Sequence, residues 1–364
     1  MIVTILIILV FSGIVYVFMQ QPQFGKLPSG ERLARIENSP NYRNGAFQNV
    51  NHTPDLTEGA SLFTVLKEFI FNKNEGKKPN GILPTIKTDL KNIHPNENAV
   101  VWFGHSSYFL QIDGKKILVD PVLSGSASPV FFTTKAFEGT DVYTADDFPE
   151  IDYLFISHDH WDHLDYQTIL QLKSKIKKVI CGLGTGAHFE HWGFDLENII
   201  EKDWNETIVL DENFTVQTVS ARHFSGRGFK RNQSLWMSYA LQTPTLKIFI
   251  GGDSGYDNHF NEAGEKFGPF DLVILENGQY DKNWKYIHML PLQVIQAAKD
   301  LKAKMLFPVH SAKFSLANHN WDEPLKLITE LSESNLIPVM TPKIGEKTDL
   351  NLESISYKWW EFLN

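Results

Sequence analysis

The sequence has 364 residues, of which 42% are hydrophobic and 21% are charged. This composition excludes a wholly disordered chain and indicates a packed globular protein of one large domain or two small ones. Because the formal net charge is −9, the chain has no general attraction to nucleic acid phosphates, and we expect no nucleic acid partner.

An uncharged apolar segment opens the chain. Residues 2–19 contain no charged side chain, and the first basic residue is Lys26. Eighteen residues of α-helix span roughly 27 Å, which is close to the hydrocarbon thickness of a bilayer. The segment lacks the basic start and the small-residue cleavage site of a signal peptide, so we expect residues 1–20 to be an uncleaved single-pass membrane anchor. The side of the membrane stays open, although basic residues after the span favour a cytoplasmic body.

Residues 21–98 are rich in proline, glycine and asparagine. Only residues 62–71 have the apolar periodicity of a helix, with Leu62, Val65 and Leu66 on one stripe. We therefore interpret residues 21–98 as an extended N-terminal arm or lid rather than a separate domain.

Strands and helices alternate over residues 99–345, which we interpret as the catalytic domain. Residues 100–121 predict two or three strands with a tight turn at Asp113-Gly114. Further strands are expected over residues 151–157, 177–182, 207–243, 247–250, 270–276 and 304–310, and helices over residues 165–175, 290–303 and 322–333. Because strands cluster first and then alternate with helices, we expect an α/β fold of two face-to-face sheets with helices outside. Residues 346–364 form an aromatic tail, which either lies at a membrane interface or packs on the body.

A histidine-rich hexapeptide, HDHWDH at residues 158–163, directly follows one of the predicted strands. A loop leaving a strand turns alternate side chains inward, so His158 and His160 can face one ion while Asp162 and His163 face a neighbouring one. Imidazole and carboxylate groups suit zinc, and also iron or manganese. The sequence has a single cysteine, which excludes a cysteine-rich metal site.

Three more candidate ligands follow apolar strands further along the chain: His223, Asp253 and His310. Taken together, the candidates form two sets with one residue between them. The first set is His158, His160 and His223, the second is Asp162, His163 and His310, and Asp253 lies between. Two glycines before Asp253 allow the backbone to come close to the site.

These motifs resemble the metallo-β-lactamase superfamily of metallohydrolases over roughly residues 99–345. The resemblance implies a four-layer αββα sandwich and a site for two metal ions, with Asp253 as the bridging ligand. Many β-lactamases of this superfamily with two zinc ions have a cysteine where Asp253 stands, so we do not expect antibiotic hydrolysis.

Within the superfamily, the sequence is similar to N-acyl-phosphatidylethanolamine phospholipase D and its bacterial relatives. The similarity rests on SHDHWDHLD, ARHFSGRG, GGDSGY, HMLPLQ and the segments FGHSSYFLQIDGKKILVDPVLS and PVHSAKFSLANHNWDEP. It implies phospholipase D-type cleavage of a phosphodiester by a hydroxide that bridges two divalent ions, with zinc the expected metal. Asp253 would orient the hydroxide, and His288 would bind the lipid phosphate or assist the leaving group. The arm before residue 98 matches only loosely.

A membrane lipid is the expected substrate and the bilayer the expected partner, because an anchored enzyme meets headgroups at high effective concentration. Pairing with a second copy of the chain stays open. We expect Phe131 and Phe132 to pack in the core rather than to enter the bilayer, and His105 is either a partner of the ligands or a core residue. Two other hypotheses are a lactonase or other small-molecule hydrolase on the same two-metal site, and a non-catalytic membrane-bound metal protein.

Overall fold

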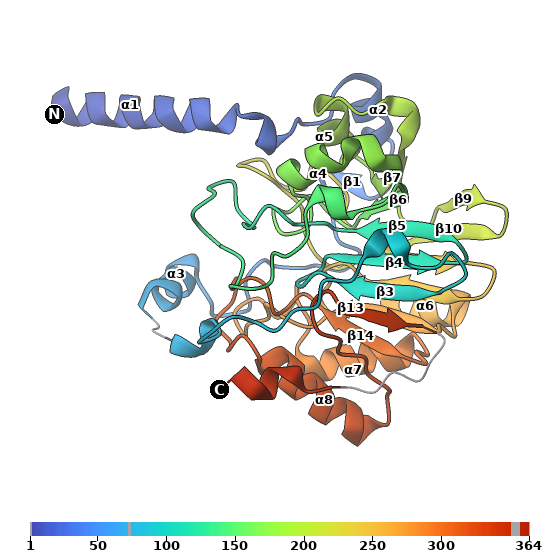
Figure 1. Ribbon diagram of the computed structural model, residues 1–364. Coiled ribbons are helices and arrows are strands. Elements are labelled where there is room, and N and C mark those ends of the chain that lie inside the picture. Colours follow the sequence, from blue (N-terminus) through green and yellow to red (C-terminus); the bar gives the residue numbers. More distant parts are fainter. Residues whose placement is uncertain (1, 72–73, 351–356, 364) are drawn as a thin grey trace.

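Two β-sheets stacked face to face form the centre of the protein (Figure 1). The structure is a computed structural model that describes residues 2–71, 74–350 and 357–363. The first sheet has seven strands in the order β15 (Lys347–Asp349), β3 (Ala99–Trp102), β4 (Tyr108–Ile112), β5 (Lys115–Val119), β6 (Ile151–Ile156), β7 (Ile176–Gly182) and β8 (Ile199–Lys202). The second has six in the order β14 (Leu306–Val309), β13 (Leu272–Glu276), β12 (Lys247–Ile250), β11 (Ser238–Gln242), β10 (Phe214–Val219) and β9 (Thr207–Asp211).

Each sheet contains a parallel half and an antiparallel half. Strands β5 to β8 run parallel in the first sheet, as do β12 to β14 in the second, and the remaining pairs are antiparallel. The inner faces share one buried cluster, in which the rings of Trp102 and Phe307 meet at 6.1 Å. Burial of these apolar faces fixes the two sheets against each other.

Helices cover the outer face of each sheet. Helices α4 (Tyr166–Leu172) and α5 (Gly186–His191) pack on the first sheet, and α6 (His259–Phe267), α7 (Pro291–Asp300) and α8 (Glu323–Asn335) pack on the second. The expected αββα sandwich is therefore confirmed. Short 3₁₀ helices connect elements: η1 (Pro22–Phe24), η2 (Glu75–Lys77), η3 (Leu90–Asn92), η4 (Ala145–Asp147), η5 (Lys173–Lys175), η6 (Leu196–Asn198) and η7 (Trp359–Leu363).

The predicted turn at Asp113-Gly114 joins β4 to β5. Ile112 pairs with Lys115, and the two residues between them have φ angles of 48° and 77°. Positive φ at both central positions is what a two-residue turn of this twist requires, and Asp-Gly is a preferred pair there.

Helix α1 (Ile2–Met19) projects away from the sandwich (Figure 1). None of its residues is buried, which excludes a core helix, and its mean hydropathy of 2.8 and length suit a membrane span.

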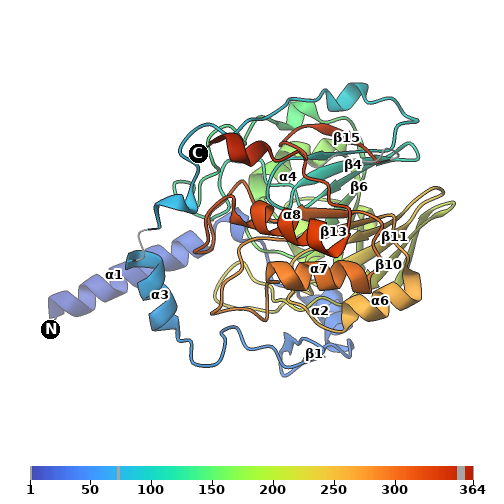
Figure 2. The same ribbon diagram turned by 90° about the horizontal axis from the view of Figure 1, so that it is seen from below.

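The arm that follows wraps the body and contains α2 (Gly30–Glu37), β1 (Tyr42–Arg43), β2 (Ala46–Phe47) and α3 (Leu62–Phe71) (Figure 2). The helix predicted over residues 62–71 is confirmed. Ile36 and Phe47 are fully buried, and the backbone N–H of Phe47 donates to the carbonyl of Asn232 at 2.9 Å. The arm is therefore packed against the sandwich rather than hanging from it.

Several details differ from the sequence-based expectations. Phe131 and Phe132 are 75% and 64% exposed, so their placement in the core was wrong. The short helices α5 and α6 were not predicted. The first sheet continues past residue 345, because β15 pairs with β3. The tail packs on the body through the buried rings of Trp359 and Trp360, while residues 351–356 lie outside the described residues.

Candidate metal centre

The candidate ligands converge because they follow strands that end at the same edge of the sandwich. The histidine-rich hexapeptide begins two residues after β6 ends, and His310 directly follows β14. His223 follows β10, and Asp253 follows β12 after two glycines. All seven residues predicted as ligands lie in clusters of potential ligand atoms that are linked by shared residues.

The first group consists of three histidines whose ligand atoms lie within 4.8 Å of one another: His158, His160 and His223. Nδ1 of His160 lies 2.8 Å from Nε2 of His158 and 3.3 Å from Nε2 of His223. Burial lowers the pKa of all three imidazoles, that of His160 to about 4. They are therefore neutral near pH 7, which is the form that binds a metal ion.

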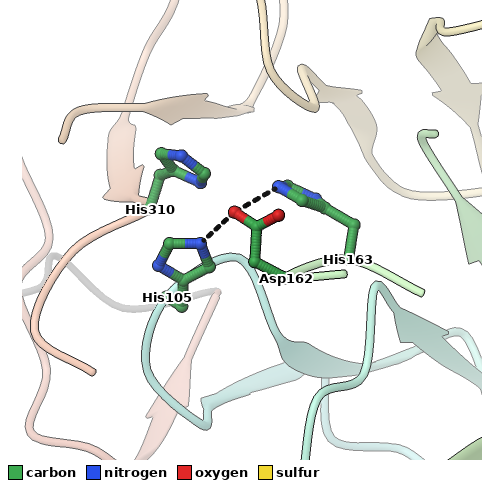
Figure 3. A group of neighbouring side chains, drawn as sticks. All are labelled: His105, Asp162, His163 and His310. Carbon is green, nitrogen blue, oxygen red and sulfur yellow. Dashed lines mark hydrogen bonds and ion pairs between the residues drawn. The ribbon is translucent and has the colours of Figure 1, made fainter. Parts of the chain in front are cut away.

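The second group surrounds the carboxylate of Asp162 (Figure 3). One oxygen, Oδ2, lies 2.9 Å from Nε2 of His105 and 3.6 Å from Nε2 of His163, and His310 lies beside them. Asp162, His163 and His310 are thus brought together as expected. His105, for which the sequence left open a ligand partner or a core residue, is fully buried and holds Asp162 by a hydrogen bond.

Asp253 lies between the two groups. Its Oδ2 is 3.2 Å from Nε2 of His163, 3.9 Å from that of His158 and 3.8 Å from that of His223. Its Oδ1 lies 3.2 Å from Nδ1 of His310. Burial raises the pKa of Asp253 to about 6, against the opposing effect of His163. One carboxylate therefore faces ligand atoms of both groups, as a bridging ligand must.

Two buried atoms at this centre test whether a metal fits. Nε2 of His163 and Oδ1 of Asp253 make no hydrogen bond with any described residue. A buried polar atom without a partner costs about 1–3 kcal/mol, so a native protein rarely leaves two of them adjacent. A divalent cation bound by imidazole nitrogen and carboxylate oxygen would satisfy both atoms, and this donor set suits zinc, iron or manganese.

Outer hydrogen bonds fix the orientation of the ligand rings. Oδ2 of Asp120 lies 2.9 Å from Nδ1 of His163, and Nδ1 of His223 donates to the carbonyl of Ile287 at 2.9 Å. Both rings thereby present Nε2 to the centre. The sequence analysis missed Asp120, which follows β5 just as Asp253 follows β12; the same strand-end signal would have found it.

His288 lies beside both groups, with its ring centre 5.1 Å from that of His223 and 5.3 Å from that of His310. Its Nδ1 is 2.6 Å from Oε2 of Glu276, and the other oxygen of that carboxyl group, Oε1, accepts the backbone N–H of Met289 at 2.6 Å. Glu276 is fully buried at the end of β13, and burial raises its pKa. This contact fixes the His288 ring through Nδ1, so Nε2 is the ring nitrogen that can interact with a substrate. The sequence analysis missed Glu276, another strand-end acid.

A cavity of about 440 Å³ opens onto these residues. Its wall includes the apolar side chains of Leu56, Trp284 and Leu316, together with Arg231. Arg231 pairs with Asp55 of the arm at 2.6 Å and stacks on the ring of Phe224 at 4.0 Å. The arm thus supplies part of the wall, which the sequence did not predict.

The arm also holds a ligand residue directly. Oδ1 of Asn49 accepts the backbone N–H of His223 at 3.1 Å, and Nδ2 of Asn49 donates to the carbonyl of His223 at 2.8 Å. The arm is therefore part of the site's support.

Comparison with known proteins agrees with this geometry. Residues 115–311 match the family described as the Beta-lactamase superfamily domain, which is more than half of the chain. The chain belongs to the metallo-β-lactamase superfamily. Membership supports a metal-dependent hydrolase and implies divalent metal ions at the histidine–aspartate centre.

The chain is also similar to individual proteins of several organisms. An uncharacterized protein of Mycobacterium tuberculosis is 36% identical over 328 residues, which cover 89% of this chain and 88% of that protein. The N-acyl-phosphatidylethanolamine-hydrolyzing phospholipase D 1 of Caenorhabditis elegans is 27% identical over 305 residues, covering 79% and 85%. A solved metallo hydrolase from Ignicoccus hospitalis has a TM-score of 0.54 at 18% identity, covering 70% of this chain and 98% of that one, and supports the shared fold.

In this superfamily member, Arg227 fastens the segment after α1 to the metal loop. Its guanidinium donates to the carbonyl of Gln23 at 3.1 and 2.8 Å, and to the carbonyl of Asp159 at 2.9 Å. It also stacks on the ring of Trp161 at 3.9 Å. The exit of the apolar helix is therefore bonded to the loop that carries the candidate ligands.

Proposed function

We propose that the protein is a membrane-anchored phosphodiesterase that cleaves N-acyl-phosphatidylethanolamine-like phospholipids in a phospholipase D-type reaction. The observation that carries the proposal is the placement of Asp253 between two groups of ligand atoms beside a cavity with an apolar wall and one guanidinium. Similarity to a phospholipase D of this substrate class supports it.

Two divalent ions, with zinc the expected metal, are the proposed cofactor. The proposed ligands are His158, His160 and His223 for one ion, Asp162, His163 and His310 for the other, and Asp253 for both. When bound, such ions lower the pKa of a water molecule and offset negative charge on the phosphoryl oxygens.

The cavity suits a phosphodiester attached to lipid chains. The guanidinium of Arg231 matches the geometry and charge of a phosphate, and the neighbouring Leu56, Trp284 and Leu316 suit apolar chains. Arg231 would exchange its contact with Asp55 for one with the substrate.

Two side chains act directly in the proposed reaction. The carboxylate of Asp253 orients the attacking water toward phosphorus. Nε2–H of His288 donates a hydrogen bond to the phosphate and then its proton to the departing alkoxide, while the Glu276 carboxyl, whose pKa is raised by burial, gives a proton to Nδ1 and keeps the ring neutral. The bond between phosphorus and the headgroup oxygen breaks, and the products are a phosphatidate and an N-acylethanolamine.

Helix α1 would hold the enzyme in the membrane that contains its substrate. Its 18 residues, its high mean hydropathy and the absence of any buried residue along it support this role. A bilayer around the helix would cover apolar side chains that the sandwich leaves open to solvent.

One purified sample of the full chain tests the proposal. Metal analysis is expected to give about two ions per chain, and mass spectrometry of N-acyl-phosphatidylethanolamine vesicles is expected to show N-acylethanolamine and phosphatidate. Parallel assays use a bis-aryl phosphodiester and a lactone. Turnover of the lactone alone would replace the proposal with a lactonase, and fewer than one ion per chain with no activity on adding metal would indicate a non-catalytic protein.

A further inference from the structure

Exposed phenylalanines are concentrated on a few segments of the described chain. Seven have strongly exposed side chains: Phe11, Phe63, Phe71, Phe131, Phe132, Phe229 and Phe362. All except Phe362 belong to α1, to α3 or to two loops that flank the metal centre. Large exposed apolar patches are uncommon on soluble proteins and mark contact surfaces.

Helix α3 is the largest of these features outside α1. Leu62, Phe63 and Leu66 are 75%, 77% and 54% exposed, so much of the apolar surface of this helix is open to solvent instead of facing a core. The helix is fixed to the body, since Oε2 of Glu68 accepts a hydrogen bond from Asn283 at 2.9 Å. The next residue, Trp284, lines the metal cavity. Helix α3, with its exposed apolar side chains, therefore lies at one side of the cavity mouth.

The loop with Phe131 and Phe132 stands beside the exit of α1. Phe131 shares a cavity of about 300 Å³ with Gln21 and Gln23, the residues that follow α1, and with Trp161 of the metal loop. Both phenylalanine side chains are largely open to solvent.

The loop with Phe229 also faces α1. Phe229 and Lys230 line a cavity of about 660 Å³ together with Val15 and Tyr16 of α1. Phe229 is 84% exposed, and the residue after Lys230 is Arg231 of the metal cavity. Aromatic side chains are favoured at the interface between membrane and water, and a neighbouring lysine can reach lipid headgroups.

Helices α1 and α3 project on the same side of the sandwich in both views (Figures 1 and 2). We propose that this side is a second membrane contact, in which α3, Phe131-Phe132 and Phe229 enter the interfacial layer of the bilayer that α1 spans. The proposal rests on membrane anchoring by α1 as proposed above, and it assigns the bilayer surface as the partner. The contact turns the mouth of the metal cavity toward the lipid headgroups, so a substrate can enter without leaving the membrane.

Site-specific labels in the full chain test this contact. The single cysteine, Cys181, is fully buried, and burial raises the pKa of its thiol, so an introduced surface cysteine can be labelled selectively. Phe63→Cys, Phe132→Cys and Phe229→Cys each receive an environment-sensitive fluorophore in proteoliposomes that contain brominated phosphatidylcholine. Val209→Cys on β9 is the matched control, because Val209 is 72% exposed and β9 lies on the opposite side of the sandwich (Figure 1). Ile8→Cys reports whether α1 is inserted.

We expect bromine to quench the three face labels and the Ile8 label but not the Val209 label. Quenching at Ile8 with none at the three face positions would overturn the second contact while leaving the anchor intact. No quenching at Ile8 would overturn both. If the chain is a dimer in detergent and the dimer shields the labels at positions 63, 132 and 229, this surface contacts a second copy of the chain. That result would also overturn the proposal.

An activity comparison separates docking from catalysis. The triple variant Phe63→Ser/Phe132→Ser/Phe229→Ser is expected to lose about tenfold or more of its kcat/KM on phospholipid vesicles, because the second contact raises the effective concentration of substrate at the site. Its kcat/KM on a soluble bis-aryl phosphodiester is expected to stay unchanged. Equal loss on both substrates would contradict the docking role, and the quenching result stands even if no phosphodiester is cleaved.

Discussion

Asp120 and His163 form a buried pair in which Oδ2 of the aspartate lies 2.9 Å from Nδ1 of the imidazole. The same carboxylate accepts the backbone N–H of Ser157 at 2.8 Å and the Ser157 hydroxyl at 2.5 Å. These bonds set the ring so that Nε2 faces the other ligands. Asp120 therefore links the end of β5 to the metal centre through His163, without being a proposed ligand itself.

Replacing Asp120 should weaken metal binding while preserving the fold. Asp120→Asn is expected to lower metal affinity about 10- to 100-fold, which is the usual effect of removing such an outer partner. Competition with a chelating dye measures the affinity, and Asp211→Asn, an exposed carboxylate on β9, serves as the control. Wild-type metal affinity in Asp120→Asn would show that the pair has no role in orienting His163.

Removing a ligand should have a larger effect. His160→Ala is expected to reduce turnover by more than about 100-fold, because ligands matter more than their outer partners. The fold should persist, as judged by circular dichroism, and metal content should fall. His191→Ala, at an exposed position on α5, is the matched control. An inactive but fully metallated variant would count against the proposed ligand set.

His288 should affect chemistry more than metal content. His288→Ala is expected to lower kcat on a phosphodiester by about 100-fold, within the range for loss of a general acid, with metal content unchanged. Glu276→Gln is expected to retain part of the activity, because glutamine can still hold Nδ1. If metal content and activity fall together in His288→Ala, then His288 supports the metal centre rather than the substrate.

Metal removal should destabilise the folded protein. The centre packs buried imidazoles against Asp162 and Asp253, and Nε2 of His163 and Oδ1 of Asp253 have no hydrogen-bond partner among the described residues. Chelation is therefore expected to lower the melting temperature, and added zinc to restore it, because the ion binds the native state selectively. The melting temperature is measured with metal content determined in parallel. An unchanged melting temperature after complete removal would show that the centre does not need a cation for its stability.

One buried histidine outside the metal centre predicts how stability varies with pH. Burial lowers the pKa of His259 from 6.5 to about 4, against the effect of Asp257. Between pH 6.5 and about pH 4, the imidazole of His259 binds a proton in the unfolded chain but not in the folded chain. The free energy of unfolding therefore decreases as the pH is lowered through this range. The loss from this group amounts to about 3 kcal/mol.

Denaturation of His259→Gln and wild type across pH 4 to 8 measures this contribution. The variant is expected to lose less stability than wild type as the pH falls through that window. His191→Gln, at an exposed histidine, is expected to follow wild type. Parallel curves for His259→Gln and wild type would show that burial does not prevent protonation of His259.

The sequence predicted the site residues whose position follows from the neighbouring secondary structure. Ligands that directly follow apolar strands, such as His158 and His310, were identified because strand ends meet at one edge of a sheet. Partners that meet only through the packing of distant segments were not. Asn49 reaches His223 across 174 positions, and Asp55 reaches Arg231 across 176, with no periodic pattern to signal either.

The fold was predicted to a similar degree. Long apolar strands and the helix at residues 62–71 were identified from periodicity, whereas α5 has six residues, too few to show a clear period. The exposure of Phe131 and Phe132 could not be predicted, because an aromatic pair in a loop has the same composition whether it faces the core or the outside.

The bonds of Arg227 have a consequence for how the enzyme would meet its lipid. Arg227 bonds Gln23, which follows α1, to the loop that carries the ligands. The metal centre is therefore held at a fixed, short distance from the end of α1. Substrate supply then becomes a two-dimensional diffusion problem, limited to lipids that share one membrane with the enzyme. Lipids in a neighbouring vesicle would remain intact even at close range.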